Sequence, residues 1–418
     1  MHSKPCLPEG HRGPVAVLDS IHGAQVIAES LIQQGVEAEA LEVYHHSQDM
    51  QRYSLVAAPV HLSSANPALV QARQLKKRVI THHRMVGSLL ADEEAFTSFE
   101  VTGTRGKTTT ALLLARMLSF SGRAISHTTR GIELWENGRA STISSGLSIT
   151  PANVLLAHRS ASLQKADFLV SEVSLGGTGA ADCGILTSLE QDYLIAGGGL
   201  WASTAKLQMM SLSRPGSALV AGIDTRISAD LSFGDGGDVQ STPSSLRWRQ
   251  RTAPLRLGDG FDPQAYLSSI AAAAAAVIRT GHDLDQAALA LEGFDGWEGR
   301  MKSFCQDGVT ILDNSNSGLK AEGVAAALRE VPPGGSLCLV VGEEAQTVCE
   351  GMDISALMEV LRAARPHLDG LVLVGSRLRS HADELRAQCA ADLRTGLALA
   401  KEGLGPGDRL VSCVKCFR

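Results

Sequence analysis

The stretch from Val101 to Thr110, which reads VTGTRGKTTT, constrains the fold of this chain more than any other. A short β-like run precedes it, and an Ala/Leu-rich run typical of a helix follows it. Gly103 and Gly106 let the backbone turn tightly without a Cβ clash, and the start of the following helix points its positive dipole end into the turn. The pattern predicts a phosphate-binding loop between a strand and a helix, and therefore an α/β domain.

The residue types in this loop favour a nucleoside triphosphate over an ordinary glycine turn that caps a helix. Lys107 can reach the β- and γ-phosphates, and the hydroxyl of Thr108 can bind Mg²⁺. The strict Walker pattern would place glycine at position 101, where this chain has Val101. We expect ATP and Mg²⁺ as ligands. The residues expected to hold the nucleotide are those of the loop itself: Gly103, Thr104, Arg105, Gly106, Lys107, Thr108 and Thr109.

Composition limits the class of protein. Hydrophobic residues make up 44% of the 418 residues and charged residues 20%, which is typical of a globular core. The net charge of −6 argues against a general nucleic-acid binder. No run approaches eighteen consecutive apolar residues, so we expect no membrane span, and the first fourteen residues lack an apolar secretory segment, so we expect a cytoplasmic protein. The sequence carries no signal for an oligomeric state.

The eight cysteines are scattered, and only Cys413 and Cys416 form a CxxC pair. No second pair and no histidine pair stands at zinc-finger spacing. We therefore expect reduced structural thiols rather than a metal site.

The first domain is expected at residues 1–95, where strand and helix signals alternate in the manner of a small doubly wound unit. It lacks the GxGxxG pattern, so we expect no dinucleotide there. Its strands are expected at Val15–Leu18, Ala40–Tyr44, Leu55–Val60 and Arg78–Thr81, and its helices at Gly23–Gln34 and Pro67–Lys77.

Two further domains are expected at residues 96–298 and 299–418. The segment between Asp230 and Leu257 is rich in Gly, Ser, Pro and Arg, which indicates a long loop or an irregular hairpin. The expected strands are Phe168–Val173, Gly184–Thr187, Ala218–Ile223, Thr310–Asp313, Leu337–Val341, Leu371–Val374 and Leu410–Val414, and the expected helices Pro263–Thr280 and Leu284–Leu291.

The TGTxGKTT form of the loop, shorter than Walker's, resembles the Mur ligase family. The resemblance implies a three-domain α/β architecture, in which a central P-loop domain is flanked by Rossmann-like N- and C-terminal domains. It also implies an enzyme that uses ATP to turn a carboxylate into an acyl phosphate, which a nucleophile then attacks. Under this reading Lys107 is catalytic as well as nucleotide-binding.

Further segments can be compared with the family pattern. Glu172 ends a strand-like run and would hold Mg²⁺ with Thr108. Lys206, in an Ala-Lys pair, matches a family lysine that is often carbamylated; the alternative is a surface lysine. Both are expected to be catalytic. Two departures stand in the segment from Thr187: Ser188 replaces an asparagine, and Tyr193 replaces a metal-binding histidine.

The nucleotide is also expected to meet the third domain. The Gly299-Arg300-Met301 element is similar to the family's GRM, so Arg300 would touch the nucleotide, and Asp313 would bind ribose hydroxyls. The alternative for Arg300 and Asp313 is a purely structural role, in which the segment is a hinge and the aspartate forms a turn. The family's HNxxN motif, which helps hold adenine, is lost here, and its positions carry Gln264, Ala265 and Ser268.

Three polar stretches indicate the substrate. They follow the first strand, the fourth strand and the helix after the loop, and lie at carboxyl ends of strands, where α/β sheets bind ligands. Imidazoles and guanidiniums there suit a polycarboxylate, because arginine pairs with carboxylates in bidentate fashion. The expected substrate-binding residues are His22, His82, His83, Arg84, Thr129 and Arg130.

Together with the tail from Cys413 to Arg418, these stretches resemble the family members that close the last carbocyclic ring of a nickel tetrapyrrole. The resemblance implies that a propionate is activated and that a ring carbon of the same molecule attacks it. Two alternatives stay open: an amide-forming ligase that joins a carboxylate to an amino-acid amine, and a nucleotide-binding protein that has lost catalysis.

Overall fold

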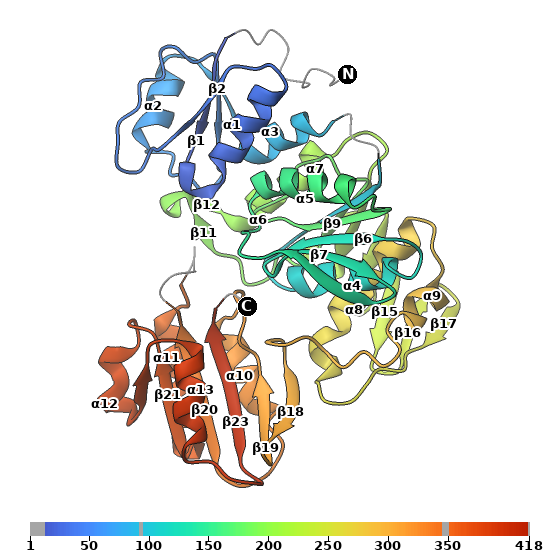
Figure 1. Cartoon of the computed structure of the whole chain (residues 1–418), viewed down its shortest axis with the longest axis vertical. Helices are drawn as coiled ribbons and strands as arrows, with labels where there is room; N and C mark the ends of the chain where they lie inside the picture. Colours follow the sequence, from blue (N-terminus) through green and yellow to red (C-terminus); the bar gives the residue numbers. More distant parts are fainter. Residues whose placement is uncertain (1–12, 92–94, 345–350, 417–418) are drawn as a thin grey trace. The chain divides into compact units, whose positions relative to one another are not determined.

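The computed structural model describes residues 13–91, 95–344 and 351–416, which form three main β-sheets with helices packed on them (Figure 1). Cys6, Cys349 and the last two residues of the tail, 417–418, lie outside the described residues. Within the described part, no helix has both the length and the apolar character needed to cross a bilayer.

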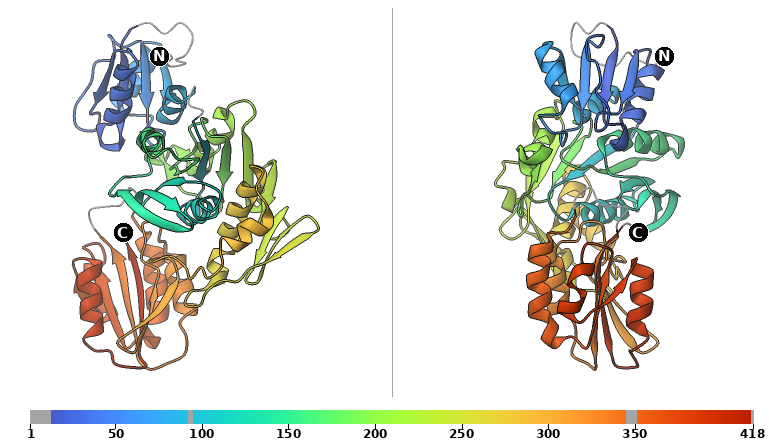
Figure 2. Two further views of the ribbon diagram at one scale, coloured as in Figure 1. Left: turned by 45° about the vertical axis from the view of Figure 1, so that its right-hand side comes forward. Right: turned by 90° about the vertical axis from the view of Figure 1, so that its left-hand side faces the viewer.

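The N-terminal sheet is fully parallel, with strand order β2-β1-β3-β4. Its strands are β1 (Val15–Leu18), β2 (Ala38–Leu41), β3 (Leu55–Ala58) and β4 (Arg78–Thr81). Alternate side chains of β1 enter two separate cores, with Val15 and Val17 on one face and Ala16 and Leu18 on the other. Helices cover both faces (Figure 2), namely α1 (Ala24–Gln33), α2 (Pro67–Gln74) and α3 (His82–Leu89). Burial on both faces explains why β1 is a continuous apolar run.

The middle sheet has a parallel centre, in the order β13-β10-β5-β9-β6. These strands are β5 (Thr97–Thr102), β6 (Ala124–Thr128), β9 (Phe168–Glu172), β10 (Cys183–Leu186) and β13 (Ala218–Gly222). The central strand β5 runs into the glycine loop and then into α4 (Lys107–Leu118). Helix α8 (Leu267–Arg279) packs on α4 through its run of buried alanines, whose small side chains let the two helices approach closely. Helices α5 (Pro151–Leu163) and α9 (Leu284–Leu289) complete this part.

Short strands extend the middle sheet on both sides. On one side are β7 (Gly131–Glu136) and β8 (Arg139–Ser144), which the sequence did not predict. On the other are β14 (Leu231–Phe233), β15 (Val239–Thr242), β16 (Ser245–Trp248) and β17 (Arg251–Pro254), where a long loop or irregular hairpin was predicted. These strands are short and mix polar with apolar residues, so they lack the continuous apolar runs by which the central strands are recognised.

A small hairpin precedes Lys206, one of the residues expected to be catalytic. It pairs β11 (Leu194–Ile195) with β12 (Leu200–Trp201) around a turn that contains Gly197, and leads into α6 (Ala202–Lys206) and α7 (Gln208–Leu212). The hairpin packs on Val60, which follows β3, and its turn lies beside Ser63.

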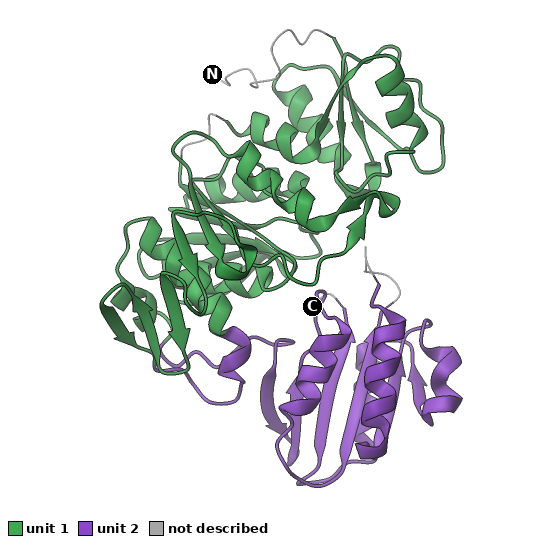
Figure 3. Cartoon of the chain, turned by 180° about the vertical axis from the view of Figure 1, so that it is seen from behind, with its two compact units in different colours: residues 1–255, 267–291 green, residues 256–266, 292–418 purple. Residues whose placement is uncertain are grey.

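The chain divides into two compact units (Figure 3): residues 1–255 with 267–291, and residues 256–266 with 292–418. The N-terminal and middle sheets therefore belong to one unit. The expected three-domain boundaries at 95 and 298 stay a prediction.

The second unit holds a six-stranded sheet in the order β18-β19-β23-β20-β21-β22, parallel except at β18. Its strands are β18 (Lys302–Gln306), β19 (Val309–Asp313), β20 (Leu337–Glu343), β21 (Gly370–Val374), β22 (Gln388–Ala390) and β23 (Arg409–Lys415). Helices α10 (Ala321–Arg329) and α11 (Ile354–Ala364) cover one face and α13 (Leu393–Lys401) the other, while α12 (Ala382–Leu385) lies near the edge. The α/β prediction is thus confirmed.

The CxxC pair does not form a site. Cys413 enters the core under α10 and α11, while Cys416 enters the opposite core under α13. Residues three apart on a strand point to opposite faces, so a spacing that serves zinc in a turn separates the thiols here.

Candidate active site

The glycine loop adopts a backbone shape that only glycine fits. Gly103 has φ 151°, and a Cβ added there would lie 2.0 Å from Oγ1 of Thr187. Gly106, with φ 76°, is the N-cap of α4, and no side chain caps this helix. The N-cap glycine offers no side-chain acceptor to the N–H groups of the first turn of α4, and a helix start of this kind is suited to binding phosphate.

The loop is fixed by the segment that follows β10. Thr187 Oγ1 lies 3.1 Å from the carbonyl oxygen of Thr102 and 2.6 Å from that of Arg105. The backbone N–H of Thr104 donates to the carbonyl of Ser188 at 2.9 Å. The Arg105 guanidinium pairs with Glu190, so we expect this residue to reach a nucleotide through its backbone. These contacts hold the loop in its shape.

Glu172 lies at the same edge of the sheet as the loop. It ends β9, is 1% exposed, and pairs in register with Val101 of β5. The backbone N–H of Thr129 donates to its Oε2 at 3.4 Å. With Thr108 buried on the first turn of α4, the structure brings the two predicted metal ligands to adjacent strand and helix ends. A carboxylate and a hydroxyl are oxygen ligands of the kind Mg²⁺ takes.

Lys206 is buried, with 1% exposure, which argues against the surface-lysine alternative. Its Nζ donates to the hydroxyl of Tyr193 at 3.3 Å and lies 4.9 Å from the centroid of that ring. Tyr193, which stands where the family has histidine, is therefore the neighbour of the lysine. Burial disfavours an ammonium group, so the position suits a chemically modified lysine or one that faces a ligand charge.

Asp192 anchors the helix that carries Lys206. Its carboxylate accepts from the backbone N–H groups of Tyr193 and Ser203, both at 2.9 Å, and from the Ser203 hydroxyl. Burial opposes the charge on Asp192, but the hydrogen bonds from Ser203 outweigh it and hold the pKa of the carboxyl below its ordinary value. The charged carboxylate thus fixes the start of α6.

In the second unit, Asp313 joins the expected GRM element to the start of the sheet. Its Oδ2 accepts from the N–H of Gly299 at 2.9 Å and its Oδ1 from the N–H of Ser315 at 3.1 Å. It also lines a groove of about 300 Å³ together with Ser412 and Lys401. The backbone carbonyl of Arg300 accepts from the hydroxyl of Tyr266 at 2.6 Å. Their roles toward ribose and nucleotide stay predictions.

A hydrogen-bonded cluster lies at the carboxyl end of the N-terminal sheet, in residues that follow β1, β2 and β3. His22 Nδ1 is 2.6 Å from Asp19 Oδ2, and the Tyr44 hydroxyl donates to the same oxygen at 2.9 Å. His61 Nε2 is 3.3 Å from it as well. Only His22 of this cluster was predicted. Asp19 and His61 were missed, although both follow strand ends in sequence, the signal used for the other residues.

Asp19 is a buried, charged acceptor. It has no exposed surface and a left-handed φ of 76°, and its Oδ1 accepts from the backbone N–H groups of Ile21 and His22 at 3.1 and 3.2 Å. Burial alone would raise the pKa of its carboxyl, but the hydrogen bonds from His22, His61 and Tyr44 dominate and hold that pKa far below its ordinary value.

His82 and His83 start α3 and are buried, with 1% and 2% exposure. Burial lowers the pKa of His82 to about 3 and that of His83 to about 4, so both rings are neutral. His83 Nε2 lies 2.8 Å from the carbonyl of Ser174, two residues beyond Glu172. Both rings are buried, whereas Arg84 is exposed. Their roles in substrate binding stay predictions.

The third predicted stretch follows β6. The Arg130 guanidinium lies 2.8 Å from a carboxylate oxygen of Glu133. Burial raises the pKa of Glu133, and Arg130 partly offsets this effect. Thr129 contributes its N–H to Glu172, as described above. The structure therefore brings Thr129 to the expected metal ligand and gives Arg130 a carboxylate partner within the protein.

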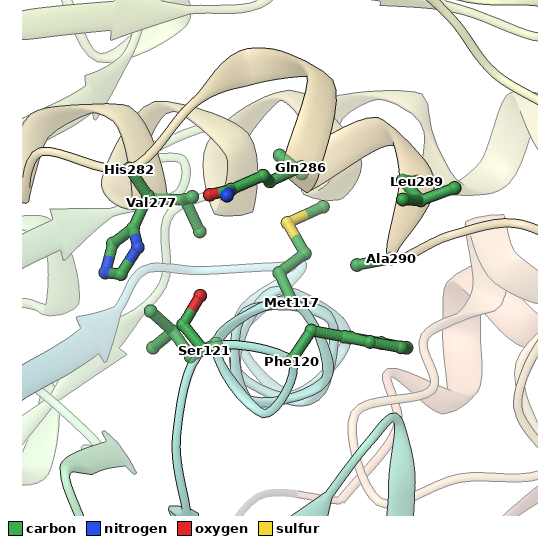
Figure 4. Close-up of a pocket in the computed structure, with 10 residues that line it drawn as sticks. Met117, Phe120, Ser121, Val277, His282, Gln286, Leu289 and Ala290 are labelled. Atoms are coloured by element: carbon green, nitrogen blue, oxygen red, sulfur yellow. The ribbon is translucent and has the colours of Figure 1, made fainter.

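A mainly apolar cavity of about 240 Å³ lies elsewhere, between α4, α8 and α9 (Figure 4). Met117 lines it from the C-terminal end of α4 and Phe120 from just beyond that helix, while Val277 and Leu289 line it from the other two helices. A helix rises about 1.5 Å per residue, so this cavity is roughly 15 Å from the glycine loop. It is not part of the candidate site.

Comparison with known proteins adds independent findings. The family model described as "Mur ligase middle domain" matches residues 101–231, and the one described as "Coenzyme F430 synthetase CfbE, C-terminal domain" matches residues 305–416. The protein named Coenzyme F(430) synthetase from Methanosarcina acetivorans is 34% identical over 469 aligned positions, which cover 97% of this chain and 99% of that one.

Two solved structures show the same fold. The pseudomurein peptide ligase type C from Methanothermus fervidus aligns over 96% of this chain and 97% of its own, with 13% identity and a TM-score of 0.56. The bifunctional folylpolyglutamate synthase/dihydrofolate synthase from Yersinia pestis was solved with AMPPNP and a Mn ion. It aligns over 80% of this chain and 90% of its own, with 17% identity and a TM-score of 0.59.

The predicted Mur ligase architecture is confirmed by these folds and by the match to the middle domain. The full-length similarity goes further, because it spans both chains almost from end to end and includes the C-terminal domain. The chain belongs to the coenzyme F(430) synthetase family, whose members are ligases built on the Mur ligase fold.

Proposed function

We propose that this chain catalyses the ATP-dependent closure of the last carbocyclic ring of seco-F(430) acid, which gives coenzyme F(430), ADP and phosphate. The observation that carries the proposal is the 34% identity to a protein named Coenzyme F(430) synthetase over 97% of this chain. The substrate is then a nickel tetrapyrrole with several carboxylates, and we expect neither nucleic acid nor a membrane as a partner.

ATP is the proposed second substrate, held by the glycine loop. The tight glycine turn at Gly103 and the start of α4, where the N-cap glycine offers no side-chain acceptor, support this assignment, because a phosphate chain binds to backbone N–H groups of this kind. Mg²⁺, held by Thr108 and Glu172, would supply positive charge to the phosphates. Arg300 and Asp313 are proposed to contact the nucleotide from the second unit.

The chemical role of the chain is to position and to stabilise charge. Lys107 would draw negative charge from the γ-phosphoryl group while the substrate propionate attacks it in line. The resulting acyl phosphate is then attacked by a ring carbon of the same molecule, so no amine site is required. We propose that Lys206 acts beside Glu172 as part of this charged edge. Such electrostatic positioning commonly accounts for most of a ligase's acceleration.

The substrate carboxylates are proposed to meet the carboxyl ends of the N-terminal and middle sheets. His22 and Arg84 lie on the N-terminal side, and Thr129 and Arg130 on the middle side. His82 and His83 would support this surface from beneath, since both rings are buried.

The test is to mix the protein with ATP, Mg²⁺ and the ring-open nickel precursor. We expect one ADP per product, a change in visible absorbance, and a product lighter by one water. ADP release that depends on an added amino acid would instead indicate an amide-forming ligase. Nucleotide binding without any ATP-dependent product would indicate a protein that has lost catalysis.

A further inference from the structure

The cluster of Asp19, His22, Tyr44 and His61 is not used by the activation step proposed above. The side chains of His22 and His61 are 24% and 31% exposed, while Asp19 beneath them has no exposed surface. Their rings meet edge to face, with centroids 4.7 Å apart. A ligand can therefore reach the imidazoles but not the carboxylate that holds them.

The hydrogen bonds define the tautomer of His22. The Asp19 carboxylate is an acceptor, so Nδ1 of His22 carries the hydrogen of the 2.6 Å contact. Nε2 is then the nitrogen that can accept a proton. Asp19 itself is immobilised by two backbone N–H groups and by the Tyr44 hydroxyl. Such a fixed carboxylate also stabilises the imidazolium that forms when the ring takes up a proton.

The cluster lies on the side of the N-terminal sheet that meets the middle sheet. Gly23, next to His22, is so close to α5 that an added Cβ would fall 2.5 Å from the Cβ of Ala152. His83, at the same edge, contacts Ser174 just beyond Glu172. A substrate bound over this edge therefore lies between the imidazoles and the strand end that carries the proposed metal ligand.

Ring closure requires a base. The carbon–hydrogen bond of the attacking carbon breaks, and its electron pair forms the new bond to the acyl carbon. The acyl carbon–oxygen bond breaks, and phosphate leaves with that pair. The proton of that carbon ends on the released phosphate or in solvent, but a base beside the carbon must take it first as the new bond forms. We propose that His22, positioned by Asp19 and His61, is the base that takes this proton. The proposal rests on the ring-closure function.

A metal ion is the rival reading, because the ligand atoms of Asp19, His22 and His61 all lie within 4.8 Å of one another. The 2.6 Å contact between Asp19 and His22 argues against it. Two ligand atoms on a tetrahedral zinc lie about 3.3 Å apart, given bonds of about 2.0–2.1 Å. The observed distance is that of a hydrogen bond.

The experiment compares product with ADP in the full-length protein and in His22→Gln, with exposed His45→Gln as the matched control. We expect product formation by His22→Gln to fall about 100-fold or more, the usual contribution of a general base. ADP release that depends on the precursor should continue, because the acyl phosphate still forms and is hydrolysed. Product formation by Asp19→Asn should fall less than that by His22→Gln. Added imidazole should partly restore product formation by His22→Ala.

The outcomes separate the two proposals. Product and ADP that fall together, product within about threefold of the wild type, or a stoichiometric metal lost on His22→Gln would each overturn the role of His22 while ring closure stands. A wild-type protein that makes no ring-closed product would overturn both. Retained binding of AMPPNP by the variants excludes misfolding as the cause of any loss.

Discussion

At the scale of single residues, the proposed chemistry of this protein depends on residues whose positions are fixed by contacts with their neighbours. Gly103 is fixed by the neighbouring Thr187, Lys206 by its burial beside Tyr193, and His22 by Asp19. Each of these residues is common in proteins, and only its neighbours distinguish it.

Lys107→Ala should reduce ATP-dependent product formation by at least about 100-fold, because the variant lacks the positive charge that stabilises the γ-phosphoryl group in the transition state. The measurement is steady-state ADP release with precursor. Lys165→Ala, at a position with a left-handed φ outside the site, is the control for a changed lysine count. Full turnover by Lys107→Ala would contradict the proposed nucleotide site.

Gly103→Ala should destabilise the fold by about 1–3 kcal/mol and weaken nucleotide binding, because its Cβ would collide with Thr187 Oγ1. Gly35→Ala is the matched control. Its φ is 79°, also in the left-handed region, but nothing lies within 4 Å of an added Cβ. That variant should lose only the roughly 1 kcal/mol of the backbone conformation. Urea unfolding and AMPPNP titration measure both effects, and equal losses in the two variants would contradict the steric argument.

At the scale of elements, the β11–β12 hairpin has two different faces. Ile195 and Leu200 pack on the neighbouring Val60, while the cross-strand pair Leu194 and Trp201 is 51% exposed at both positions. Directly paired residues share one face of a hairpin. An exposed aromatic and aliphatic pair beside the His61 segment is the kind of surface on which a flat macrocycle can stack.

Trp201→Ala should therefore raise KM for the tetrapyrrole about tenfold and leave KM for ATP unchanged, since the lost stacking and burial amount to roughly 1.4 kcal/mol. Leu163→Ala, at an 82% exposed residue of α5, is the control for a lost surface hydrophobe. An unchanged KM for the tetrapyrrole would show that the hairpin has no part in binding.

The elements also show what the sequence could predict. Strand β1 matches its predicted bounds because a parallel strand buried on both faces is an unbroken apolar run, and the edge strand β4 matches its bounds through its β-branched residues. Strands β7, β8 and β14 to β17 were missed or left as a loop, because polar residues interrupt the apolar ones in each of them. The glycine loop could be predicted because its residues are adjacent in the sequence. The Asp19–His61 contact joins residues 42 positions apart, so it could be found only from the three-dimensional structure.

At the scale of the whole molecule, four histidines that are buried in the described part of the chain couple stability to pH. Burial lowers the pKa from 6.5 to about 3 for His82 and to about 4 for His83, His127 and His158. The unfolded chain takes up protons below about pH 6.5, whereas these folded rings do so only near pH 4. Stability should therefore fall as the pH drops through this window.

The expected slope is up to about 1.4 kcal/mol per pH unit for each such histidine between pH 6 and pH 4.5. Urea unfolding at a series of pH values measures it. His158→Gln should lower the slope by up to about 1.4 kcal/mol per pH unit, which corresponds to one proton fewer taken up on unfolding. The exposed control His45→Gln should leave the slope unchanged. A free energy of unfolding that stays level from pH 7 to pH 5 would contradict the prediction.

The opposite-facing thiols of β23 have a practical consequence for handling the protein in air. Cys413 and Cys416 look into separate cores, so an oxidant cannot join them while the strand remains in its sheet. Burial also raises the pKa of Cys413, which keeps its sulfur in the unreactive thiol form. An alkylating reagent should modify exposed Cys305 long before either of them, as peptide mass mapping would reveal. The final strand should thus survive aerobic purification with its sulfur chemistry intact.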